Sequence, residues 1–210
     1  MGRRASDDAG QAFPIYIMVV AGLLFLAFAY LAVGQAAANR NGAQTAADAA
    51  ALAAAQETRD LLAADWRDVV ADPAKWQEIF DGDGLLFKEC WRAEELADQN
   101  DANVEDCGKS EGRVGYTVVV EANESVGDSI VPGTEDYKST ATATAVIEPL
   151  CDFDLPGGDG GEGDEGDEGD GNDTLPLPQL TCDDGEFEPD PDDPDTLPHP
   201  EDLFDVHLAD

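Results

Sequence analysis

The run AFPIYIMVVAGLLFLAFAYLAV, from Ala12 to Val33, is 22 residues long and contains no charged side chain. At ~1.5 Å rise per residue, a helix of this length spans roughly 33 Å, which is enough to cross a hydrocarbon core of about 30 Å. Tyr16 and Tyr30 lie near its two ends, where aromatic side chains favour the membrane interface. The sequence therefore predicts a leader at residues 1–11 and a transmembrane helix at residues 12–34.

The stretch beyond the apolar run is rich in alanine, the best helix former, up to about residue 70. We expect one long helix from the membrane outward, with Gly42 as its weakest point. Apolar residues share one face of this helix at helical spacing, and Arg59 interrupts them. This face predicts that the helix packs against a small domain as its spine. It also predicts an assembly helix, which contacts other subunits and includes Ala46, Asp48, Leu52, Ala55, Leu62 and Trp66.

Flanking charges predict the orientation of the span. Arg3 and Arg4 precede the apolar run, and the first cation after it is Arg40. Lys and Arg favour the cytoplasmic side, so we expect a cytoplasmic N-terminus and an extracytoplasmic remainder, in a single-pass protein of the cell membrane. A cleaved signal peptide is the alternative, with a small-residue cleavage site near Ala36. The length of the apolar run, and Asp7 and Asp8 in the leader, favour a retained anchor.

The chain is strongly acidic, with 47 Asp and Glu against 11 Lys and Arg and a formal charge of −36. The acidic residues are concentrated in the C-terminal part of the sequence, since residues 151–210 hold 22 Asp and Glu and no Lys or Arg. Such a surface repels nucleic acid and anionic lipid, so we expect no nucleic-acid partner. Cations or basic proteins would be attracted instead.

The four cysteines are Cys90, Cys107, Cys151 and Cys182. An even number in an exported segment predicts disulfides, and four cysteines allow three pairings. Pairing neighbours along the chain is the simplest of these. A zinc site is disfavoured because no Cys-x-x-Cys spacing is present.

Alternating residues predict two strands in the second half of the domain. Residues 113–121 place Val114, Tyr116, Val118 and Val120 on one side, and residues 137–148 alternate alanine with threonine. Alanine on one face of a strand leaves room for the alanine-rich helix, and residues 131–134 predict the turn between the strands. Short helices are expected at residues 73–80, before a turn at residues 81–84, and at residues 85–99. The predicted fold class is α+β, with a long helix packed on a small antiparallel sheet within residues 35–150.

Residues 151–210 are predicted to form a disordered acidic tail. Its run of Gly, Asp and Glu at residues 157–171 buries too little apolar surface to offset chain entropy, and residues 188–202 are rich in Pro and Asp. A solvated spacer is the favoured interpretation of this run, weak calcium binding by its carboxylates is the alternative, and no cofactor is expected.

Catalytic motifs are lacking in the sequence. It contains no nucleophile elbow, HExxH motif, phosphate loop or dinucleotide fingerprint, and both histidines fall in the predicted tail. We therefore expect a protein that is not an enzyme and has no catalytic or metal-binding residues.

The segment GQAFPIY at residues 10–16, the membrane helix, and AQTAADAAALAAA at residues 43–55 resemble the N-terminal region of TadE/TadG-like proteins of the tight-adherence (Flp) pilus system, in the style of actinobacterial members. The resemblance covers about residues 8–60. It implies a pseudopilin-like or assembly component of a Flp pilus, with other pilus-assembly proteins as partners. Prepilins cleaved after glycine carry glutamate at the fifth mature position, and counting from Gly10 this position is Ile15. The anchor is therefore expected to be retained.

The sequence thus favours a membrane-anchored envelope protein of pilus assembly, which uses the membrane helix and the spine at residues 36–64 for assembly contacts. A generic anchored adhesion or cation-binding protein with a functional acidic tail is the second hypothesis. An exported hydrolase is the third, and no residue constellation supports it.

Overall fold

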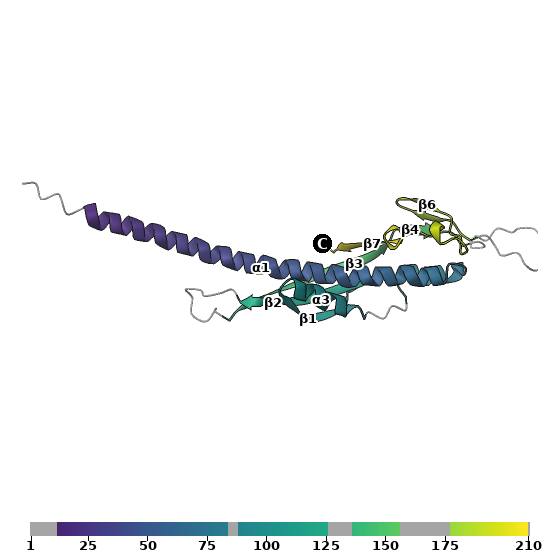
Figure 1. Cartoon of the computed structure of the whole chain (residues 1–210), viewed down its shortest axis with the longest axis horizontal. Coiled ribbons are helices and arrows are strands. Elements are labelled where there is room, and N and C mark those ends of the chain that lie inside the picture. The colour runs from purple at the N-terminus through teal and green to yellow at the C-terminus, as the bar shows by residue number, and fades with distance from the viewer. Residues whose placement is uncertain (1–11, 84–87, 126–135, 156–176, 210) are drawn as a thin grey trace, which may run out of the picture.

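The computed structural model describes residues 12–83, 88–125, 136–155 and 177–209. One helix, α1 (Ala12–Asp68), dominates the molecule, and its 57 residues extend over roughly 86 Å. Its first half projects freely, and its second half runs along a small domain of strands and short helices (Figure 1). The predicted long helix on a small antiparallel sheet is confirmed.

Helix α1 is continuous through Gly42, as expected from the many alanines around it. Pro14 lies in the first turn, where the missing N–H has no helical partner to lose. The helix ends before Asp72 and Pro73, since a residue preceding proline is disfavoured in helical conformation; Asp72 has φ −125° and ψ 79°. After it follow η2 (Pro73–Lys75), α2 (Trp76–Phe80) and α3 (Cys90–Gln99).

These short helices largely match the prediction. The helix expected at residues 73–80 is present as η2 and α2, and Asp81–Asp83 form a turn. The helix expected at residues 85–99 begins only at Cys90, and residues 84–87 lie outside the described part of the chain. The turn expected at residues 131–134 also lies outside it.

The main sheet is antiparallel in the order β1-β2-β3-β7. Its strands are β1 (Ala102–Lys109), β2 (Gly115–Ser125), β3 (Lys138–Pro149) and β7 (Phe204–Leu208). Strands β2 and β3 correspond to the two strands predicted from alternation. Alternate residues of both strands, among them Val118, Val120 and Ala145, are buried in the core that they share with α1, and Thr140 and Thr142 of β3 are exposed. Methyl side chains on α1 and β3 let helix and sheet lie close together.

Strand β2 runs antiparallel to α1. Thr58 of α1 contacts Tyr116 near the start of β2, and Asn39 contacts Glu124 and Ser125 at its end. The 19 residues between Asn39 and Thr58 rise ~28 Å as helix, and the nine residues from Tyr116 to Ser125 cover ~31 Å as strand. The end of β2 therefore points toward the N-terminus of α1, as Figure 1 shows.

The prediction of disorder after Leu150 is wrong for residues 151–155 and 177–209. These residues form β4 (Cys151–Phe153), β5 (Leu180–Cys182), β6 (Gly185–Phe187), η3 (Pro194–Thr196), α4 (Pro200–Leu203) and β7. Strands β4, β5 and β6 make a second, three-stranded sheet, and β7 completes the main sheet. The acidic run at residues 157–171, which carries the disorder prediction most strongly, lies outside the described residues.

Scattered apolar residues explain this order. Leu180, Leu203 and Phe204 are at most 1% exposed, and they join the main core. The composition of the tail as a whole is rich in Asp and Pro, so it gives no sign of these few apolar residues. A few large apolar side chains are nevertheless enough to hold short strands against an existing core.

An aromatic cluster closes the core at the end of α1. Trp66, Trp76, Phe80, Phe153 and Phe204 form consecutive ring contacts with centroids 5.2–5.4 Å apart. This cluster joins α1 to α2, β4 and β7, so segments far apart in sequence share one packed unit.

Candidate functional site

The projecting half of α1 is the most unusual surface of the described molecule. From Phe13 to Val33 its large apolar side chains are exposed, including Phe13 at 72% and Tyr30 at 83%. The helix is long and apolar enough to cross a membrane, and none of its most apolar window is buried inside the protein. A core helix of a soluble protein would cover these side chains. Exposed apolar surface of this extent instead needs lipid or a partner to cover it.

The second half of α1 is covered by its own domain. Of the six residues predicted to form the assembly helix, Ala46, Ala55 and Trp66 are fully buried, Leu62 is nearly so, and Leu52 packs against the core. Asp48 lies at the edge, where the Gln44 amide donates to its carboxylate at 2.8 Å. The structure therefore brings the six residues together as part of the domain's own packing.

Asn39 joins the projecting half to the domain. Its Nδ2 donates to the backbone carbonyls of Glu124 at 3.0 Å and Ser125 at 3.3 Å, at the end of β2. We define this pair of hydrogen bonds as the Asn39 clamp. Sequence reasoning missed it, because its partners are backbone carbonyls 85 and 86 residues further along the chain.

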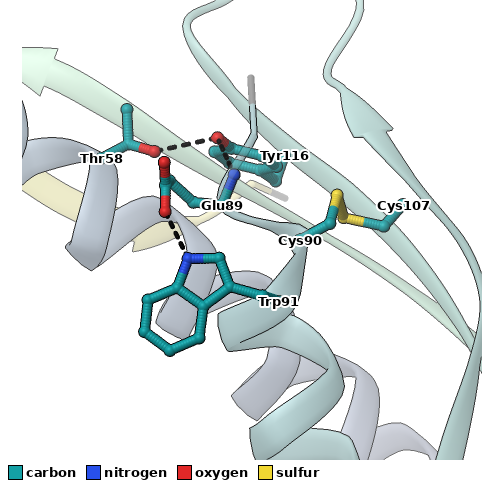
Figure 2. The surroundings of a disulfide bond; sticks show 6 residues. All are labelled: Thr58, Glu89, Cys90, Trp91, Cys107 and Tyr116. Carbon is teal, nitrogen blue, oxygen red and sulfur yellow. Dashed lines mark hydrogen bonds between the residues drawn. A yellow bond between two sulfur atoms is a disulfide. The ribbon is translucent and has the colours of Figure 1, made fainter. Parts of the chain in front are cut away.

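A buried hydroxyl pair holds the middle of α1 to β2 and to the start of α3. Thr58 Oγ1 donates to Tyr116 Oη at 2.9 Å, and the backbone N–H of Glu89 donates to the same oxygen at 3.4 Å (Figure 2). Burial raises the pKa of the Tyr116 hydroxyl, while these two hydrogen bonds oppose the rise. The phenol therefore stays protonated at neutral pH and acts as a structural link.

Both predicted disulfides are present, and they pair neighbours along the chain. Cys90–Cys107 joins the first residue of α3 to β1, and Figure 2 shows it close to the Tyr116 network. Cys151–Cys182 joins β4 to β5 across the second sheet. Disulfides of this kind are typical of domains that fold in an oxidising compartment.

Two open grooves lie on the described part of the domain. One, of about 710 Å³, runs from the exposed threonine face of the sheet to Gln44 and Asp48 of α1. Another, of about 630 Å³, lies around Asn39 and the end of β2. Among the described residues, no group of three or more His, Cys, Asp or Glu is placed to hold a metal ion.

One exposed apolar helix that continues into a small, disulfide-bonded α+β domain fits a class of protein: a single-pass membrane anchor carrying its domain on the same helix. Residues 10–57 of the chain match the family described as "Putative Flp pilus-assembly TadE/G-like". The match confirms the resemblance over almost the same residues, from the start of α1 into its buried half, and the sheet lies beyond it. No curated protein and no solved structure gave a significant match.

Proposed function

We propose that this protein is a single-pass envelope protein that assists the assembly or anchoring of a Flp-type pilus. The observation that carries the proposal is the coincidence of the exposed apolar half of α1 with the residues that match the pilus-assembly family. A pilus-associated membrane protein is supported by these two findings together. The finer role, as a pseudopilin-like or assembly component, is our proposal.

The proposed orientation places the N-terminus in the cytoplasm and the α+β domain outside. The two disulfides support this orientation, because cytosolic thiols are normally kept reduced. Arg3 and Arg4 support it through the positive-inside rule.

The proposed assembly contacts lie on the projecting half of α1. Burial of Ala46, Ala55 and Trp66 removes this face of the second half of α1 from contact with partners. Other pilus proteins would therefore meet this chain within the membrane or just outside it. The proposal includes no catalytic step and no resident cofactor.

Genetic complementation in the source bacterium tests the role. Removal of the gene should abolish or strongly reduce Flp piliation, and the full-length chain should restore it. A variant that lacks residues 157–171 separates the two leading hypotheses, since it removes only the acidic run and leaves every described element intact. Normal piliation in this variant supports the assembly role. Normal piliation with no gene at all would contradict it.

Loss of cell adhesion in the same variant, with pili unchanged, would favour the anchored adhesion or cation-binding protein instead.

Mass spectrometry of the mature N-terminus provides a separate check on the anchor. We expect the apolar run to be retained, and a new N-terminus near Gln35 would contradict the anchored state.

A further inference from the structure

The Asn39 clamp fixes the distance between the apolar run and the end of the sheet. Asn39 is six residues beyond Val33 on an unbroken helix, which corresponds to ~9 Å along the axis. The carbonyls that Asn39 holds belong to Glu124 and Ser125, the last residues of β2. The end of the sheet is therefore held close to the point where the apolar run stops.

Strand β3 begins at the same end of the sheet. Its first residue, Lys138, is paired with Ser125, and Tyr137 precedes it by one residue, or ~3.4 Å. Since β2 ends and β3 begins toward the N-terminus of α1, Tyr137 lies ~6 Å beyond the level of Val33, on the side of the domain. Headgroup layers are about 5–7 Å thick on each side of the hydrocarbon core, so this height falls within one of them.

Side chains at this end have the character of interfacial anchors. The Tyr137 side chain is 70% exposed although it is large and aromatic. Arg40 is exposed on α1 one residue after Asn39, and Lys138 forms an ion pair with Glu121 at 3.1 Å. Tyrosine favours the level of lipid headgroups, and basic side chains favour lipid phosphates.

We infer that the end of the sheet at Tyr137 and Lys138, together with Arg40, is a second membrane contact that rests in the lipid headgroup layer beside the span. The Asn39 clamp ties this end of the sheet to α1 just beyond the exposed apolar half, and the inference rests on the proposed membrane anchoring. The nearby carboxylates Glu124 and Asp136 would repel anionic lipid, so the partner surface is a zwitterionic headgroup layer. The contact sets the height and tilt of the domain above the bilayer.

Fluorescence quenching in phosphatidylcholine vesicles tests the inference. The full-length chain, with its native disulfides, is labelled with an environment-sensitive fluorophore at one introduced thiol: Tyr137→Cys, Lys75→Cys or Leu24→Cys. Lys75 is exposed beyond the far end of α1, and Leu24 lies in the middle of the apolar run. The quenchers are a headgroup-attached spin label and a spin label deep in the acyl chain.

The label at Tyr137 should be quenched by the headgroup spin label at least ~2-fold more than the label at Lys75, as expected for a group at the interface. Equal quenching at the two positions, with Leu24 quenched by the deep spin label, would overturn the inference and leave the anchor intact. Lack of deep quenching at Leu24 would contradict the anchor and the inference together. The substitution Asn39→Ala should lower quenching at Tyr137 without changing it at Leu24, and unchanged quenching at Tyr137 would show that the clamp does not set this height.

Discussion

At the scale of single residues, Gly115 occupies a crowded position of the sheet. It begins β2 with φ +155°, and a Cβ added there would lie 2.1 Å from the carbonyl oxygen of Ala145 on β3. Both atoms belong to paired strands, so neither can move without disturbing the ladder between them. The position therefore requires glycine for steric reasons.

We predict that Gly115→Ala destabilises the domain by ~1–3 kcal/mol or more. Thermal unfolding of the full chain in detergent, followed by the fluorescence of the buried Trp66 and Trp76, measures the change. The matched control is Gly108→Ala on β1, where an added Cβ meets nothing within 4 Å. Similar unfolding temperatures for the two variants would contradict the steric argument.

Tyr116 gives a second prediction, which concerns pH. Because burial raises the pKa of its hydroxyl in the folded state, the protonated form is favoured by folding. The corresponding stability is present below the ordinary tyrosine pKa of about 10, and it is lost as pH rises through the higher pKa of the folded state. Unfolding by urea at pH 8 and at pH 10.5 should show this loss in the native chain.

The variant Tyr116→Phe should lose less stability than the native chain over the same pH interval, because it removes the buried phenol. At pH 8 it should be less stable than the native chain by about 0.5–1.5 kcal/mol, since Thr58 and Glu89 lose a hydrogen-bond acceptor. An identical pH dependence in both proteins would rule out Tyr116 as its source.

At the scale of elements, α1 could be predicted from the sequence because an uncharged apolar run is followed at once by an alanine-rich stretch, and both favour a helix. Strands β2 and β3 could be predicted from the alternation that runs through most of each strand. Strand β1 could not, since residues such as Asn103, Asp106 and Gly108 have low strand propensity and only pairing with β2 makes them extended. The Asn39 clamp depends on two backbone carbonyls more than 80 residues away, which no local pattern reveals.

Close contact between α1 and the sheet gives a prediction for the helix. Ala50 is fully buried on α1, and Ala64 is exposed on the same helix. The substitution Ala50→Leu should destabilise the domain by ~1–3 kcal/mol through overpacking, whereas Ala64→Leu should change stability little. Urea unfolding of both variants measures the difference. Equal stability would mean that the interface has room for larger side chains.

At the scale of the whole molecule, the end of the chain belongs to the core. Phe204 of β7 is 1% exposed and packs against Phe80 of α2, with centroids 5.2 Å apart. Its strand pairs with β3 from Ala145 to Pro149. The average composition of residues 151–210 predicted disorder here because many of the surrounding residues are acidic. Burial of a few individual apolar side chains, such as Phe204, is enough to order the strand in spite of that average composition.

We expect Phe204→Ala to cost about 3–5 kcal/mol, the range for removing a buried phenylalanine side chain. Leu208→Ala at the end of the same strand should cost much less, because Leu208 is 36% exposed. Tryptophan fluorescence during thermal unfolding compares the two. A native-like unfolding temperature for Phe204→Ala would show that residues 204–208 contribute little to the fold.

The unbroken course of α1 through Gly42 has a mechanical consequence. A helix without a hinge transmits rotation about its own axis, because twisting one half against the other would break its backbone hydrogen bonds. A neighbouring protein that binds the apolar half and prevents its rotation also fixes the direction in which the sheet faces around the membrane normal, because the two halves belong to one helix. In the proposed membrane-anchored state, contacts of the apolar half set the direction in which the sheet faces around the membrane normal, and the headgroup contact at Tyr137 sets the height and tilt of the domain.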